Sequence, residues 1–298
     1  MLQKLVGTII GDAMIDYALP IVNPDDFRYL LRGGVTQTQA TITPGGATNV
    51  ATVLSMLGSP TAFIGKVGSD NHGECVRQDL IKHHVLSKLS VSDDLPTGKV
   101  FNLVLPGGQR FFLVDRGANS NLLVDDIDEN TCLNSNIVYL NGYSFQDNIT
   151  ERSIRTIVND ISQSVKILFN PGAPNLCEKY KKEFLSLIRN HVDIVILNED
   201  EAFALTGCSE SDAVQELLSL GIDTCAVTMG AEGSVVASSF EVLPIIADLI
   251  ANPVDTTGAG DAYAAAFIHG LQRGWDLKKV GDFASKVAAD LVKVHGTR

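Results

Sequence analysis

The feature that most constrains the fold of this chain is a series of short, apolar, β-branched runs. LVGTII, TAFIGKV, IVYLNG, VKILFN, DIVILN and TCAVTM begin at residues 5, 61, 137, 165, 193 and 224. They show no apolar–polar alternation, which is typical of strands buried on both faces of a parallel sheet. Amphipathic segments with helical periodicity separate them, such as ATNVATVLSML from residue 47 and TERSIRTIVNDIS from residue 150. This order predicts a doubly wound α/β sheet covered by helices.

Two segments depart from that scheme. RGGVTQTQATIT (residues 32–43) and TGKVFNLVLPGGQRFFLV (residues 97–114) alternate apolar and polar positions, as half-exposed antiparallel strands do. The residues Pro106, Gly107 and Gly108 supply a turn within the second segment. We therefore expect a small accessory sheet beside the main one. The chain of 298 residues, 45% of them hydrophobic, is long enough to bury a sizeable core.

Charge and composition argue against several classes of partner. The 35 acidic and 23 basic side chains give a formal charge of −12, which repels nucleic acids and anionic membrane surfaces. The sequence contains no apolar run of the roughly 18 to 20 residues that a membrane helix needs, and its N-terminal stretch lacks the pattern of a signal peptide. The five cysteines are widely spread and include no CxxC pair, unlike a disulfide framework or a zinc site. We expect a soluble, cytoplasmic protein without nucleic-acid or membrane partners.

The stretch DTTGAGDAYAAAF, from residue 255, predicts a helix that begins at an anion-binding site. Ligands of open parallel sheets bind beyond the carboxyl ends of the strands, where a starting helix presents unpaired N–H groups and the positive end of its dipole. Gly258 and Gly260 allow the backbone to approach an anion closely. The four residues from Gly258 to Asp261 would hold the charge on a transferred phosphoryl group, and Asp261 could accept a proton from an attacking hydroxyl.

A second glycine-rich stretch, PGGATNVATVLSMLGSPTAFIGKVGSDNHGE, begins at residue 44. Gly45 and Gly46 precede Asn49, which stands in the first turn of a predicted helix, and Gly68 and Asp70 follow the next predicted strand. A glycine pair before a helix is weak evidence by itself. Together and in this order, however, the two stretches resemble the two signature patterns of the ribokinase-like, or PfkB, carbohydrate kinases. The resemblance extends from about Gly11 to the last predicted helix.

This resemblance implies a single kinase domain over residues 1–298. Its fold would be a three-layer, doubly wound, mainly parallel sheet with a small β-sheet lid, formed by about residues 11–45 and 95–115. Such lids close over the sugar in relatives and often pair into a homodimer. The implied activity is magnesium- and ATP-dependent phosphorylation of a hydroxymethyl group, with Asp261 as the base that takes the proton.

The resemblance also implies roles for individual residues. Asp261 matches the catalytic base, and the N–H groups of Gly258, Ala259 and Gly260 match the anion hole. Asp16 matches the aspartate that binds paired sugar hydroxyls, because a carboxylate can accept two neighbouring hydroxyl donors. The remaining residues on the substrate side are Gly45, Gly46 and Asn49, with Arg116 as a candidate contact for a substrate carboxylate or phosphate.

On the nucleotide side, Asn198 and Glu201 match the NxxE element of the family, which organises Mg²⁺ and the nucleotide phosphates, often through water. Asp255 matches a residue beside a monovalent cation in relatives, and a requirement for K⁺ stays open. The residues expected along the nucleotide are Asn170, Thr228, Gly230 and Gly233.

Several of these residues have plainer interpretations. Asp12 is an alternative to Asp16 as the hydroxyl-binding carboxylate. Glu201 follows Glu199 and Asp200, so the three could form a solvated acidic cluster. The glycines of VTMGAEGSVV could serve only as a β-hairpin turn. Arg116 could form a surface ion pair.

Three functions remain open. The first is a sugar kinase of the ribokinase or fructokinase type. The second is a nucleoside kinase, whose base pocket could come from aromatic residues near the lid, although these could equally form lid core: Tyr17, Phe101, Phe111 and Phe112. The third is a catalytically silent sugar-binding protein, which the intact Asp261 stretch disfavours. The sequence does not identify the sugar, because fold alone does not fix function.

Overall fold

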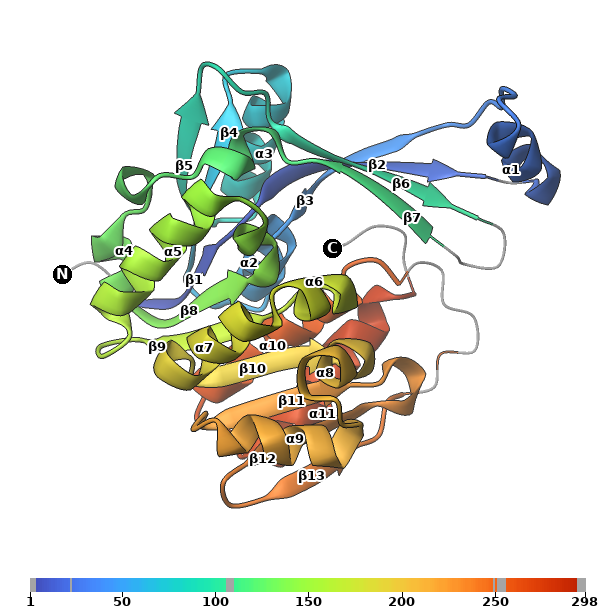
Figure 1. Cartoon of the computed structure of the whole chain (residues 1–298). Helices are drawn as coiled ribbons and strands as arrows, with labels where there is room; N and C mark the ends of the chain where they lie inside the picture. The colour runs from blue at the N-terminus through green and yellow to red at the C-terminus, as the bar shows by residue number, and fades with distance from the viewer. Residues whose placement is uncertain (1–3, 22, 106–109, 249, 251–255, 294–298) are drawn as a thin grey trace.

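The computed structural model describes residues 4–21, 23–105, 110–248, 250 and 256–293. These residues form a large sheet of nine strands and a small sheet of four (Figure 1). The strands of the large sheet are β1 (Leu5–Ile10), β4 (Thr61–Gly68), β5 (Leu86–Ser92), β8 (Ser135–Asn141), β9 (Lys166–Asn170), β10 (Ile194–Asn198), β11 (Thr224–Thr228), β12 (Ser234–Ser238) and β13 (Val242–Ile245).

The large sheet is mainly parallel, as the buried runs predict. Its order is β13-β12-β11-β10-β9-β8-β1-β4-β5, and neighbouring strands from β11 to β5 pair in parallel. β12 is antiparallel to both β11 and β13. Because β4 and β5 follow on one side of β1 and β8 to β11 lie on the other, the sheet has a topological switch point between β1 and β8. Such a switch point is where ligands bind in open α/β sheets.

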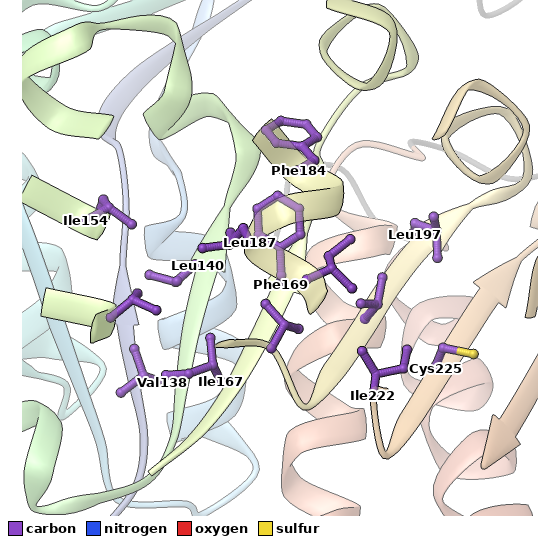
Figure 2. Close-up of a cluster of buried hydrophobic side chains, with 14 of the residues drawn as sticks. Val138, Leu140, Ile154, Ile167, Phe169, Phe184, Leu187, Leu197, Ile222 and Cys225 are labelled. Atoms are coloured by element: carbon purple, nitrogen blue, oxygen red, sulfur yellow. The ribbon is translucent and has the colours of Figure 1, made fainter. Parts of the chain in front are cut away.

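Helices cover both faces of the large sheet, which confirms the three-layer prediction. One layer consists of α4 (Glu129–Leu133), α5 (Asn148–Ile161), α6 (Pro174–Lys179), α7 (Lys181–His191), α8 (Glu199–Thr206) and α9 (Glu210–Ser219). The other consists of α2 (Thr48–Met56), α3 (Asn71–Lys82), α10 (Ala259–Gln272) and α11 (Leu277–Leu291). Figure 2 shows the first interface, where Phe169 of β9 packs with Phe184 and Leu187 of α7. Burial of these apolar side chains on both sides fixes the layers.

The small sheet projects from the large one, with α1 (Pro24–Leu31) near its far end (Figure 1). Its strands are β2 (Ala13–Pro20), β3 (Thr41–Gly46), β6 (Gly98–Val104) and β7 (Arg110–Asp115), in the order β3-β2-β6-β7. β2 pairs antiparallel with β3 and parallel with β6, and β6 pairs antiparallel with β7. The expected strand over residues 32–43 begins only at Thr41, because β2 pairs with Thr41–Gly46 and residues 32–40 have no strand opposite them. The expected turn at 106–108 lies outside the described residues.

Within the described part of the chain, we find no helix with the length and apolar character required to cross a membrane.

Candidate active site

The helix α10 begins at the glycine-rich stretch as expected. Gly258 is its N-cap residue, with a φ of +79° that only glycine adopts readily. Gly260 lies in the first turn, where helix geometry gives its N–H no carbonyl partner. A Cβ atom at Gly260 would meet no described heavy atom within 4 Å, so this turn borders open space. The N–H of Ala259 donates to the carbonyl oxygen of Thr256 at 3.3 Å, so it already has a partner. The N–H of Gly260 and the left-handed backbone of Gly258 are the features of this helix start that suit an anion.

Asn49 and Asp261 meet at this helix start. The Asn49 Nδ2 donates to Asp261 Oδ2 at 3.0 Å, although 212 positions separate the two residues. Asn49 is buried in the first turn of α2, and α2 packs against α10. The amide therefore sets the orientation of the carboxylate, and both glycine-rich stretches contribute to one site.

The carboxylate of Asp16 lies directly on the glycine pair. A Cβ atom at Gly45 would stand 2.1 Å from Asp16 Oδ2, a contact that only glycine avoids. Gly46 has a φ of +69°, and the N–H of Ala47 donates to the carbonyl oxygen of Asp12 at 2.9 Å. These contacts hold the glycine pair against Asp12, just before β2, and against Asp16 within that strand. Since Asn49 follows Gly45 by four positions, Asp16 and Asp261 belong to the same region.

Asp12 and Arg116 form a buried ion pair beside this region. Arg116 Nη1 and Nη2 donate to Asp12 at 2.7 and 3.1 Å, and Arg116 Nε donates to Asp147 Oδ2 at 2.5 Å. The Arg116 side chain is only 11% exposed, so this is no surface pair. Burial raises the pKa of the Asp12 carboxyl, and the guanidinium opposes that rise. We call the backbone of Gly45 and Gly46 the glycine edge. Of the two candidate carboxylates, Asp16 lies on the glycine edge and Asp12 is held by Arg116.

Asn198 and Glu201 cap the start of α8. Asn198 Oδ1 accepts from the Glu201 N–H at 2.8 Å, and Glu201 Oε2 accepts from the Asn198 N–H at 3.0 Å, which is a capping box. Glu199 and Asp200 are exposed, but Glu201 is buried, unlike a member of a solvated cluster. Burial raises the pKa of Glu201 to about 7, the charge of Asp200 adds to the rise, and the bonds to Asn198 oppose it.

A buried carboxylate of this kind would be stabilised by a cation. In the chain as described, no group of three or more His, Cys, Asp or Glu side chains could hold a metal ion. Glu201 offers one buried carboxylate, and a single carboxylate together with substrate phosphates is a donor set compatible with a Mg²⁺ ion that keeps several waters.

Polar side chains end four neighbouring strands of the large sheet. Asn141, Asn170, Asn198 and Thr228 are the last residues of β8, β9, β10 and β11, and the strand registers pair Asn141 with Asn170 and Asn198 with Thr228. The sequence analysis did not select Asn141, which is buried and lies against Gly11. Its signal was a recurring pattern, since IVYLN, KILFN and IVILN each end a buried strand with asparagine. This row runs along the edge where the site lies.

A pocket of about 240 Å³ lies next to the start of α10. The β11–β12 hairpin turn borders it, with Gly230 at φ +55° and Gly233 at φ +104°, so these glycines do form a hairpin turn and also line a cavity. Tyr263 lines it from α10, and its hydroxyl lies 2.9 Å from Ser234 Oγ. Most of the other lining residues are small, and three are larger: Thr228, Ala231, Ala247, Thr256, Ala259, Gly260, Ser285, Ala288 and Ala289, with Asp248, Ile250 and Val292. Asp255 lies outside the described residues.

Comparison with known proteins identifies the family. A family model described as pfkB family carbohydrate kinase matches residues 8–298. The chain belongs to the pfkB carbohydrate kinase family. It is 29% identical to a ribokinase of Staphylococcus aureus over 313 aligned positions, covering 100% of this chain and 96% of that protein.

Solved structures of pfkB-like kinases agree with this assignment. The adenosine kinase of Sinorhizobium meliloti has a TM-score of 0.89 and 28% identity, covering 99% of this chain and 96% of that one. An uncharacterized sugar kinase of Pyrococcus horikoshii, solved in complex with ATP, has a TM-score of 0.79 and 28% identity, covering 98% and 93%. The doubly wound sheet with a separate small sheet is therefore the ribokinase-like fold.

Three of the four aromatic residues considered for a nucleobase pocket lie on the face of the small sheet opposite Asp16. Tyr17 pairs in register with Phe101, and the rings stack with centroids 5.1 Å apart. Because side chains alternate between the faces of a sheet, both lie on the face opposite Asp16. Phe111 also belongs to that opposite face and stacks on Phe27. By register, Phe112 alone of the four shares the face of Asp16.

Proposed function

We propose that this protein transfers the γ-phosphoryl group of ATP to a hydroxymethyl group of a small sugar. The observation that carries the proposal is the hydrogen bond between Asn49 and Asp261 at the start of α10. The bond fixes the Asp261 carboxylate in the first turn of α10, which is a glycine-rich helix start at the carboxyl edge of the parallel sheet. That combination of a base and an anion site is what phosphoryl transfer needs.

In this proposal, Asp261 accepts the proton of the attacking hydroxyl, and Asn49 holds the carboxylate in position. The N–H groups of Gly258 and Gly260 stabilise the charge on the transferred group, that of Ala259 joins them when it exchanges Thr256 for the phosphoryl oxygen, and the helix dipole adds to the effect. Asp16 accepts hydrogen bonds from two hydroxyls of the acceptor, and Gly45 leaves its carboxylate room to do so. Gly46 is the second residue of the glycine edge.

ATP would lie along the row of strand ends, with its base in the pocket beside the β11–β12 turn. The pocket volume and its small lining side chains support this placement. The Pyrococcus horikoshii relative solved in complex with ATP supports ATP as the nucleotide. Asn170, Asn198 and Thr228 would face the phosphates from consecutive strand ends, and Gly230 and Gly233 would follow the nucleotide. Glu201 would hold Mg²⁺ through water. Bound there, the ion would neutralise phosphate charge.

A nucleoside is the second candidate acceptor, since the structure of the Sinorhizobium meliloti adenosine kinase is similar over almost the whole chain. Its ribose would present the same hydroxymethyl group and the same diol to Asp261 and Asp16. Against it, Tyr17 and Phe101 lie on the wrong face of the small sheet to stack on a base near Asp16. A silent binding protein is disfavoured because Asp261 is both present and positioned by Asn49.

We propose further that the small sheet acts as a lid and that two copies of the chain associate through it. Strand β7 is an edge strand with four consecutive apolar residues that are 47–65% exposed, from Phe111 to Val114. Unpaired edges with exposed apolar side chains favour pairing with another chain. Light scattering should give the mass of a dimer for the wild type and of a monomer for Leu113→Lys.

The test of the activity is a coupled assay of ATP consumption across ribose, fructose and adenosine, with Asp261→Asn in parallel. Loss of a general base should lower kcat by roughly 10² to 10⁴, while ATP binding, measured by calorimetry, stays intact. As a matched control, Asp223→Asn removes the same charge at the opposite end of β11, where Asp223 pairs with Lys166. Equal turnover by wild type and Asp261→Asn would contradict the proposed base. Exchange of K⁺ for Na⁺ in this assay tests the predicted cation site at Asp255.

A further inference from the structure

We infer that the acceptor is an uncharged sugar, polyol or nucleoside, and not a sugar phosphate or a sugar acid. The inference rests on the proposed function and names its substrate class. It follows from how the basic side chains around the glycine edge are already bound.

Arg116 is the basic residue best placed to bind an anionic acceptor, since it contacts Asp12 directly after β1. Its Nε, Nη1 and Nη2 atoms all donate to protein carboxylates, two of them to Asp12 and one to Asp147. Two carboxylates thus face one guanidinium, and the group carries no surplus positive charge. The side chain is also largely buried, so the fork has little surface left for a ligand. Binding an anion would require breaking charge-assisted hydrogen bonds within a buried cluster.

Two other basic residues approach the same region. Lys66 of β4 follows Gly65, whose backbone packs against Gly11 at the end of β1. Lys66 is buried, and its Nζ lies 2.6 Å from Asp126 Oδ2, so a carboxylate of the protein neutralises it. Lys99 pairs in register with Ile15, which places it on the face of the small sheet opposite Asp16. Neither lysine is arranged to meet an anion at Asp16.

The acidic groups of the site lead to the same conclusion. Three carboxylates lie around the glycine edge: the Asp16 carboxylate lies against Gly45, Asp261 accepts from Asn49, and Asp12 accepts from Ala47 through its backbone carbonyl. A phosphate or carboxylate on the acceptor would add negative charge to this partly desolvated region, where Coulomb repulsion is stronger than in water. Neutral hydroxyls, in contrast, are the donors that carboxylates accept. The charge pattern therefore selects against anionic acceptors.

Matched pairs of acceptors test this directly, because each pair offers the same free hydroxymethyl group with and without an anion. Suitable pairs are fructose and fructose 1-phosphate, and glucitol and gluconate. We expect kcat/KM for the neutral member of the pair that is used to exceed that of the anionic member by at least about 100-fold. Preference for an anionic member would overturn the inference and leave the kinase proposal standing. Absence of turnover with all four compounds and with adenosine would overturn both.

A variant tests whether the pairing of Arg116 is the cause. Asp147→Asn removes one of the two carboxylates on the guanidinium and keeps the side-chain volume. It should raise kcat/KM for the anionic member relative to the neutral one by about tenfold. Asp223→Asn, the same change at the far edge of the sheet, should leave this ratio unchanged. An unchanged ratio in Asp147→Asn, or an equal rise in both variants, would contradict the role given to Arg116. A cooperative thermal unfolding transition in both variants would establish that they are folded.

Discussion

The amide nitrogen of Asn49 lies 3.0 Å from a carboxylate oxygen of Asp261 and donates a hydrogen bond to it. Asn49 comes from the first turn of α2 and Asp261 from the first turn of α10, so two helix starts meet at one point. The contact brings both glycine-rich stretches into one site. The stretch from residue 255 carries the carboxylate and the proposed anion site, and the stretch from residue 44 carries the amide that orients the carboxylate.

Removing that amide should impair the reaction without unfolding the protein. A hydrogen bond to a charged group contributes about 1.5–3 kcal/mol, so Asn49→Ala should lower kcat/KM by roughly 10- to 100-fold. Steady-state kinetics of the ATP-dependent reaction measure this. Asn136→Ala is the control. Asn136 lies at the start of β8, away from the site, and its amide donates to the side chain of Gln272. If both variants lose activity equally, the Asn49 contact has no special part in the reaction.

Gly260→Ala should separate stability from activity. A Cβ atom there meets no described heavy atom within 4 Å, and alanine is preferred to glycine in a helix by up to about 1 kcal/mol. The free energy of unfolding should therefore stay the same or rise. The methyl group would occupy the space proposed for a phosphoryl group, so kcat should fall by about 100-fold.

The corresponding change at Gly258 should, in contrast, lower the stability. Gly258 has a φ of +79°, and Gly258→Ala should lose about 1 kcal/mol of stability through backbone strain. Urea unfolding combined with kinetics measures both variants. Full activity in a stable Gly260→Ala protein would refute the proposed anion site.

Tyr263 and Ser234 should couple energetically and support nucleotide binding. Their hydroxyls lie 2.9 Å apart and both residues are buried, one on α10 and the other directly after the turn that ends at Gly233. Tyr263→Phe leaves the Ser234 hydroxyl without this partner and should cost about 1–2 kcal/mol of stability. It should also raise the KM for ATP several-fold, because the turn and α10 border the same pocket.

The double variant Tyr263→Phe/Ser234→Ala provides the check. It removes both hydroxyls, so its loss of stability should be smaller than the sum of the two single losses. Strictly additive losses would mean that the two hydroxyls do not interact.

His269 should make the protein less stable at mildly acidic pH. It is buried, with Nδ1 2.8 Å from Ser59 Oγ, and the desolvation of the ring and the charge of Arg273 lower its pKa from the ordinary value of 6.5. As pH falls below 6.5, the unfolded chain takes up the proton first, so the free energy of unfolding falls. Between pH 8 and pH 5.5 the free energy of unfolding should fall by up to about 1 kcal/mol more in the wild type than in His269→Gln.

Urea unfolding at the two pH values measures this difference. His84→Asn is the control, since His84 is exposed and its φ of +58° is one that asparagine tolerates. The control should keep the pH dependence of the wild type. The same pH dependence in His269→Gln as in the wild type would rule out this histidine as the source.

The sequence determined six of the nine strands of the large sheet and the place where α10 begins, since its apolar runs and glycine-rich stretches depend on local chemistry. The runs became β1, β4, β8, β9, β10 and β11 within a residue or two, and the DTTGAGD stretch opened α10. The exposed residues 32–40 were mispredicted as strand, because alternation alone does not reveal whether a partner strand lies opposite. Only the tertiary structure bound Arg116 to Asp12 and Asp147, buried Glu201 in a capping box and brought Asn49 to Asp261. These contacts join distant segments, and packing decides which groups become partners.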